Sequence, residues 1–229
     1  SLRSSIVSHS KTLWYGPTSA RAANATVYLN LNTSQASITM PAGTIFNATV
    51  EAVSNKFSTI ADVTKSNTGG TIPFLNTDIY EGTFITTRYT VNSSDIDQRF
   101  LLTDNRADTS TLTVKIQTSS TDTTSNTFTE ATDITQVTAS SNVYFLQEVE
   151  AGLFEIYFGD GIIGTALSDD NIIILTYIVS NKSAANGAAI FTNAATIGGI
   201  SDVAVATVST ASAGSEPETL QSIKYNAPL

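Results

Sequence analysis

Residues 172–179 read Ile-Ile-Ile-Leu-Thr-Tyr-Ile-Val, and this stretch decides the fold. In an extended chain, successive side chains point to opposite faces, so alternate residues from 172 to 178 form one apolar face. Those from 173 to 179 form a second face that is also mostly apolar. A strand with two apolar faces is covered on both sides, and the sequence therefore predicts a central strand. The run is far shorter than the roughly 18 apolar residues of a membrane span.

Other strands are predicted outward from this centre by alternation of apolar and polar residues. In residues 153–158, for example, Phe154, Ile156 and Phe158 supply a core face. The remaining predicted strands are residues 26–31, 83–91, 111–117, 143–148 and 202–209. A turn at Pro41-Ala42-Gly43 also predicts a hairpin between residues 37–40 and 44–46.

Helical patterns occur only near the two ends. Leu2, Ile6 and Leu13 recur at near-helical spacing. At the other end, Ser215 and Glu218 have the spacing of a capping box, which predicts a short helix there. Because such a helix is marginal alone, we expect the chain to be a fragment whose helical ends continue into further structure.

The predicted fold class is mainly β, with an antiparallel β-sandwich-like core, an inserted second β subdomain and short helices at the two chain ends. The expected divisions are an N-terminal helix and linker (1–21), the first part of the core (22–91), the insert (92–168), the second part of the core (169–212) and the truncated start of a helical region (213–229).

Composition excludes several function classes. The net charge of −9 opposes nucleic-acid binding, which depends on clustered Lys and Arg. The chain has no Cys and a single His, His9, so it lacks thiolate nucleophiles, Cys/His zinc sites and iron–sulfur ligation. These absences exclude most familiar site chemistry. Together with the interpretation of the remaining motifs below and the resemblance they lead to, we predict no catalytic residues, no metal or cofactor, no membrane insertion and no small-molecule substrate.

The segment Phe158-Gly159-Asp160-Gly161-Ile162-Ile163-Gly164 is the clearest motif. Glycine-rich turns of this kind can hold phosphate or, with acidic residues, calcium. This segment lacks the Lys of a phosphate loop and the acidic spacing of an EF-hand. We interpret Gly159, Asp160 and Gly161 as a structural turn that needs positive φ.

Loop carboxylates offer a second possible site. Asp95, Asp97 and Asp104, or separately Asp169 with Asp170, have the chemistry of a glycosidase pair or a calcium site. Nothing in the sequence brings any two of them into one cleft, and acidic residues are common in the turns of β proteins. We interpret them as solvated turn residues.

Five Asn-X-Ser/Thr triplets match the N-glycosylation pattern, at Asn24, Asn32, Asn47, Asn92 and Asn181. They keep open an alternative function, a secreted or cell-surface β-rich adhesin or glycan-binding module. A polysaccharide-active enzyme is a third hypothesis, which requires that replacing an acid such as Asp160 abolishes turnover.

Several ordered segments together resemble the baseplate J-like family, and more closely the baseplate wedge subunits of T-even-type (myovirus) bacteriophages. The segments, which span most of the chain, are Trp14-Tyr15-Gly16-Pro17, residues 19–22, 79–83, 97–100, 108–114, 153–164, 171–179, 185–188 and 218–228.

The resemblance implies a structural role without catalysis. It implies that the chain associates with itself, through homodimer or ring contacts, and with other wedge proteins in the six-fold plate of a contractile tail. In that family the plate rearranges on host attachment and triggers sheath contraction. The implied location is the tail baseplate of the virion, assembled in the host cytoplasm.

Overall fold

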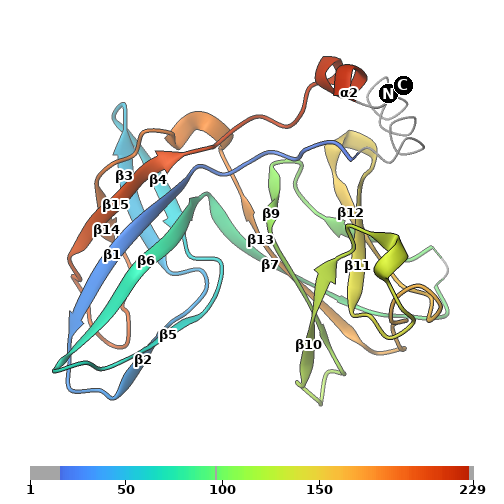
Figure 1. Cartoon of the computed structure of the whole chain (residues 1–229), viewed down its shortest axis with the longest axis horizontal. Helices are drawn as coiled ribbons and strands as arrows, with labels where there is room; N and C mark the ends of the chain where they lie inside the picture. The colour runs from blue at the N-terminus through green and yellow to red at the C-terminus, as the bar shows by residue number, and fades with distance from the viewer. Residues whose placement is uncertain (1–15, 96, 227–229) are drawn as a thin grey trace.

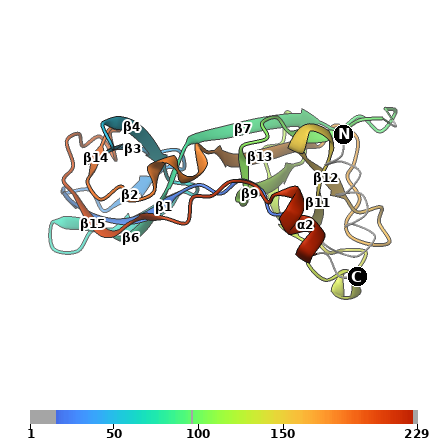
Figure 2. The same cartoon turned by 90° about the horizontal axis from the view of Figure 1, so that it is seen from above.

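In the computed structural model, which describes residues 16–95 and 97–226, the chain forms two β lobes that diverge from a shared junction (Figure 1). The first lobe contains a six-stranded sheet with a two-stranded sheet, and the second contains a seven-stranded sheet. Figure 2 shows the lobes end to end, with α2 beside the second. The predicted mainly β, largely antiparallel fold is confirmed.

The first lobe has the strand order β14-β3-β4-β6-β1-β15. Bonds from the Gly187 N–H to the Ala211 carbonyl (2.7 Å) and from the Ala211 N–H to the Ala188 carbonyl (2.8 Å) connect β15 to the segment before β14, so the sheet curls back on itself. The strands of this lobe are β1 (Asn24–Asn32), β2 (Ser37–Met40), β3 (Ile45–Val50), β4 (Val53–Ser58), β5 (Val63–Ser66), β6 (Thr71–Glu81), β14 (Phe191–Asn193) and β15 (Val205–Ser212).

The second lobe has the order β7-β13-β9-β10-β11-β12-β8, and all neighbours are antiparallel except β10 and β11. Its edge strands approach each other, since the Tyr89 hydroxyl on β7 donates to the Leu101 carbonyl on β8 at 2.8 Å. The strands are β7 (Thr83–Thr90), β8 (Phe100–Leu102), β9 (Ala107–Gln117), β10 (Ser125–Glu130), β11 (Val143–Glu148), β12 (Phe154–Phe158) and β13 (Ile172–Val179). Both lobes are therefore barrel-like.

Each lobe has its own hydrophobic core. Alternate residues of β1, Val27, Leu29 and Leu31, are buried in the first core with Phe46 and Phe74. The buried residues of the second core lie between Val91 and Val179 and include the fully buried Ile173, Leu175 and Tyr177 of β13, while Ile85 and Tyr89 of β7 pack against them. The central position predicted for residues 172–179 is confirmed, because β13 lies between β7 and β9.

The division between the sheets differs from the predicted boundaries. The sequence assigns residues 83–91 and 169–179 to the first core, whereas β7 and β13 belong to the sheet of the second lobe. The chain instead passes from one lobe to the other at Gly82 and Ser180. The reason is that β13 pairs with β9 as well as with β7, so β9 attaches both strands to the sheet of the second lobe.

One local pairing prediction is wrong, and the predicted C-terminal helix is confirmed but begins later than predicted. Residues 37–40 and 44–46 do not form a hairpin, because β2 pairs with β5 and β3 pairs with β4. The C-terminal helix α2 (Leu220–Asn226) begins after the predicted capping box, and Thr219 accepts the Ser222 N–H at 3.2 Å through its hydroxyl.

In the described part of the chain, helical structure is otherwise limited to short 3-10 turns. These are η1 (Ile134–Gln136), η2 (Glu150–Gly152) and η3 (Lys182–Ala185). The predicted N-terminal helix falls within residues 1–15, outside the described residues. Within residues 16–95 and 97–226, no helix has the length and apolar character needed to cross a membrane.

Candidate functional site

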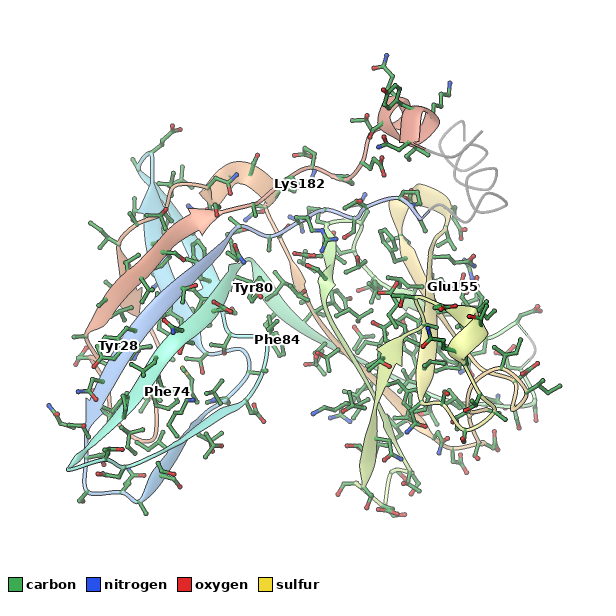
Figure 3. All side chains as sticks on the ribbon, in the orientation of Figure 1. Tyr28, Phe74, Tyr80, Phe84, Glu155 and Lys182 are labelled. Atoms are coloured by element: carbon green, nitrogen blue, oxygen red, sulfur yellow. The ribbon has the colours of Figure 1, made fainter. Side chains whose placement is uncertain are left out.

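The junction between the lobes is the most elaborate polar site in the described part of the chain. Four segments meet there: the chain before β1, the β6–β7 connection, the β13–η3 connection and the stretch after β15 (Figures 1 and 2). Tyr80 and Lys182 lie beside it in Figure 3, whereas Glu155 lies on the far side of the second lobe.

Asp108 of β9 is the centre of the junction and is only 1% exposed. Its Oδ2 accepts the N–H of Ala22 at 2.8 Å, just before β1 of the first lobe. Its Oδ1 accepts the N–H and the hydroxyl of Ser110 at 2.9 and 2.6 Å, and Arg21 Nη1 lies 3.4 Å away. This buried carboxylate therefore attaches the chain entering the first lobe to the second lobe.

Glu81, the last residue of β6, makes a second attachment and is also 1% exposed. Its Oε2 accepts the N–H of Asn181 and its Oε1 accepts the Asn181 side-chain amide, both at 2.8 Å. Burial raises the pKa of the Glu81 carboxyl above its ordinary value, while the Asn181 bonds and the charge of Arg106 act in the opposite direction. The pair fixes the chain leaving β13 to the end of β6.

Gly82 allows β6 to continue directly into β7. Its φ is +126°, and a Cβ at this position would lie 2.3 Å from the carbonyl oxygen of Val179. Any larger residue would both adopt a backbone conformation that is nearly restricted to glycine and collide with the backbone of β13. The close approach of the β6–β7 connection to the end of β13 therefore depends on a glycine at position 82.

The segments before β1 and after β15 run side by side across the top of the junction. Arg21 and Ser215 exchange backbone hydrogen bonds at 3.0 and 3.1 Å, and the Glu218 N–H donates to the Thr18 carbonyl at 2.9 Å. The Ser19 hydroxyl lies 2.9 Å from that of Thr109 on the second lobe. These two paired segments, residues 18–21 and 215–218, form a strap. The strap connects the lobes independently of the β6–β7 connection and of the chain that leaves β13.

A second polar cluster lies on the second lobe, at β12. Arg99 Nε and Nη2 donate to the two carboxylate oxygens of Glu155 at 2.9 Å, and Nη1 donates to Glu150 at 2.7 Å. The Tyr157 hydroxyl also donates to Glu155, at 2.7 Å. These bonds from Arg99 lower the pKa of both carboxyls. The cluster holds the segment before β8 against β12, and both oxygens of Glu155 are engaged within the chain.

The predicted structural turn lies in the loop between β12 and β13. The Asp160 carboxylate accepts the N–H groups of Ile162 and Ile163 at 2.9 and 3.0 Å, and these bonds lower its pKa. Gly161 has a φ of +86°, and a Cβ on Gly159 would lie 2.3 Å from the carbonyl oxygen of Gly164. The local geometry accounts for both glycines and for the carboxylate without a ligand.

The other loop acids also bond to groups of the chain itself, Asp95 and Asp169 at the loop after β7 and Asp104 elsewhere. Asp95 accepts the N–H of Asp97, and Asp169 accepts the N–H of Ser93 at 2.8 Å. Asp104 instead pairs with Arg106, at 2.9 Å. Among the described residues no group of three or more His, Cys, Asp or Glu side chains is placed to hold a metal ion. His9 lies outside these residues.

Sequence reasoning missed Asp108 and Glu81 as important residues, because their partners are 86 and 100 positions away in the chain. The signal that was available lies in the resemblance, since its segments 19–22, 79–83 and 108–114 contain most of the junction. One of the five glycosylation triplets also falls here. The side-chain amide of Asn181 is bonded to Glu81, so this Asn is not presented as a free acceptor.

The chain matches no model of a known protein family, and it matches no curated protein.

Proposed function

We propose that this chain is a structural subunit of the baseplate wedge of a contractile-tail bacteriophage. In this proposal it associates with itself and with other wedge proteins, and it has no catalytic activity and no cofactor. It belongs to the tail baseplate of the virion, after assembly in the host cytoplasm. It contributes to a plate that rearranges on host attachment.

One observation carries the proposal: four of the segments on which the family resemblance rests converge at the junction. Residues 19–22, 79–83, 108–114 and 171–179 are far apart in the chain and supply Arg21, Glu81, Gly82, Asp108 and the end of β13. These segments thus supply the contacts that fix the lobes relative to each other.

A fixed angle between lobes suits a subunit that transmits movement. Switching assemblies move largely as rigid bodies whose contacts change at discrete interfaces. A subunit that bent at its centre would absorb the movement instead of passing it on. The buried carboxylates, the close approach of Gly82 to β13 and the strap of two paired segments all oppose such bending.

Immunogold electron microscopy tests the proposal, with antibody against residues 16–226 applied to lysate from the source of the sequence. We expect label at the distal plate of contractile tails. Label on cell envelopes with bare tails would overturn the proposal and favour the adhesin alternative, for which binding to a glycan array is the next assay. Antibody preabsorbed with the purified chain is the control for nonspecific labelling.

A further inference from the structure

Strands β5 and β6 start as a hairpin and then separate. Thr68 and Thr71 bridge the turn between them, with the Thr68 N–H bonded to the Thr71 carbonyl at 2.7 Å. Beyond this bridge β5 pairs with β2, and β6 pairs with β1 over almost its whole length. No ladder joins β5 to β6 within residues 63–81, all of which the structure describes. The two strands diverge from their turn in Figure 1.

The edge of β6 that faces away from β1 is largely unpaired. Its only ladder on that side is with β4, where Phe57 pairs with Glu81 and Ser58 pairs with Tyr80. Residues 72–79 have no strand partner on this side among the described residues. The edge of β5 that faces away from β2 also has no strand partner among the described residues. Open strand edges are templates for the addition of another strand.

A depression of about 280 Å³ lies between these two edges, and we name it the β5–β6 slot. Thr59, Val63 and Lys65 line one side, and Leu75, Asn76 and Asp78 are among the residues of the other. Leu75 is 60% exposed, so the slot contains an uncovered apolar side chain between two rows of backbone groups.

We propose that the β5–β6 slot accepts an extended segment of a partner protein, which adds as a strand between β5 and β6. This addition joins the two-stranded sheet to the six-stranded one and covers Leu75. Charge complementarity describes the partner: an acidic side chain opposite Lys65, a basic one opposite Asp78 and an apolar one over Leu75. The proposal goes beyond the structural role of the junction and does not depend on it.

The partner is a different protein and not a second copy. A strand that pairs with both β5 and β6 needs both of its own edges free. All the strands of the described residues already pair on at least one edge, so a second copy must break one of its own ladders to fill the slot.

A displayed library of random ten-residue peptides, selected on the whole chain, supplies the probe. The recovered peptides are synthesised and measured by fluorescence polarisation against Leu75→Arg and the matched control Val53→Arg. Val53 is also an exposed apolar residue of the first lobe, at 62%, but does not line the slot. We expect Leu75→Arg to weaken binding at least tenfold and Val53→Arg to leave it within twofold.

Amide hydrogen exchange provides the second readout, because strand addition must slow exchange in residues 63–65 and 75–78. Recovery of no peptide, equal binding by both variants, or protection confined to another strand such as β7 would overturn the proposal. Protection of the slot that rises with protein concentration and without peptide would make a second copy the occupant, which also overturns it. Circular dichroism of both variants establishes that each is folded.

Discussion

Replacing Asp108 with Ala tests whether the junction is held by this buried carboxylate. The substitution leaves the N–H of Ala22 and that of Ser110 without their acceptor. An unsatisfied buried donor costs about 1–3 kcal/mol, and the half-exposed pair with Arg21 adds less than about 1 kcal/mol. We therefore expect the free energy of unfolding to fall by about 2–5 kcal/mol.

The matched control is Asp104→Ala. Asp104 also pairs with an arginine and accepts a backbone N–H, but its side chain is 29% exposed and that of Arg106 is 46% exposed. An exposed pair of this kind contributes less than about 1 kcal/mol. The contrast between the two variants therefore separates the effect of burial from the loss of an acidic side chain.

Urea unfolding followed by far-ultraviolet circular dichroism measures both variants. The m-value rises with chain length, and with about 3 kcal/mol per molar urea, Asp108→Ala should lower the midpoint by about 1–2 M and Asp104→Ala by much less. Amide exchange at Ala22 should also become faster in the folded Asp108→Ala protein. Equal midpoints for the two variants, with unchanged exchange at Ala22, would refute the reasoning.

Three further predictions concern the junction, the Arg99 cluster and the lobes. Gly82→Ala should destabilise the protein by more than about 2 kcal/mol, because of backbone strain and collision with β13. The control Gly69→Ala, where φ is also positive but the space is open, should cost about 1 kcal/mol. Thermal unfolding compares the two variants. Arg99 lowers the pKa of Glu155, so their bond stabilises the fold above the ordinary carboxyl pKa of about 4.3, and this stability is lost as the pH falls through the lowered value. Arg99→Ala should therefore flatten the decline in the free energy of unfolding between about pH 5 and 3. Urea titration at each pH measures this decline. The isolated second lobe, residues 83–180, should give a β-type circular dichroism spectrum and a cooperative unfolding transition. The insert predicted from the sequence, residues 92–168, lacks β7 and β13 and should give neither. The reverse result would contradict the two-core organisation.

Local patterns predicted the more regular strands, missed others such as β4 and β6, and gave the strand partners less well. The two apolar faces of residues 172–179 are sufficient to identify a central strand, and residues 143–148 pair with β12 as neighbours in the chain. Pairing between distant strands has no local signal. The ladder between β1 and β15, for example, joins Asn24 to Ser212, and the prediction of a hairpin at residues 37–46 failed because both strands pair elsewhere.

The candidate site was less predictable than the fold for a related reason. An isolated Asp or Glu in a sequence gives no sign of burial, and acidic residues are mostly exposed in proteins. Asp108 and Glu81 are buried only because the segments carrying Ala22 and Asn181 return to them from the other parts of the chain. The turn at residues 159–161 differs, since its acceptor and its donors are within three positions of each other.

The polar contacts of the junction determine how firmly the angle between the lobes is held. Each hydrophobic core stays within one lobe, so no continuous apolar interface joins the lobes among residues 16–95 and 97–226. An apolar contact can slide at little cost, whereas a buried carboxylate is satisfied in one arrangement and is strongly destabilised in others. Buried polar groups often contribute less to stability than to the choice of a single geometry. We infer that Asp108 and Glu81 define the angle between the lobes, and that shifting either lobe would leave these carboxylates without their donors.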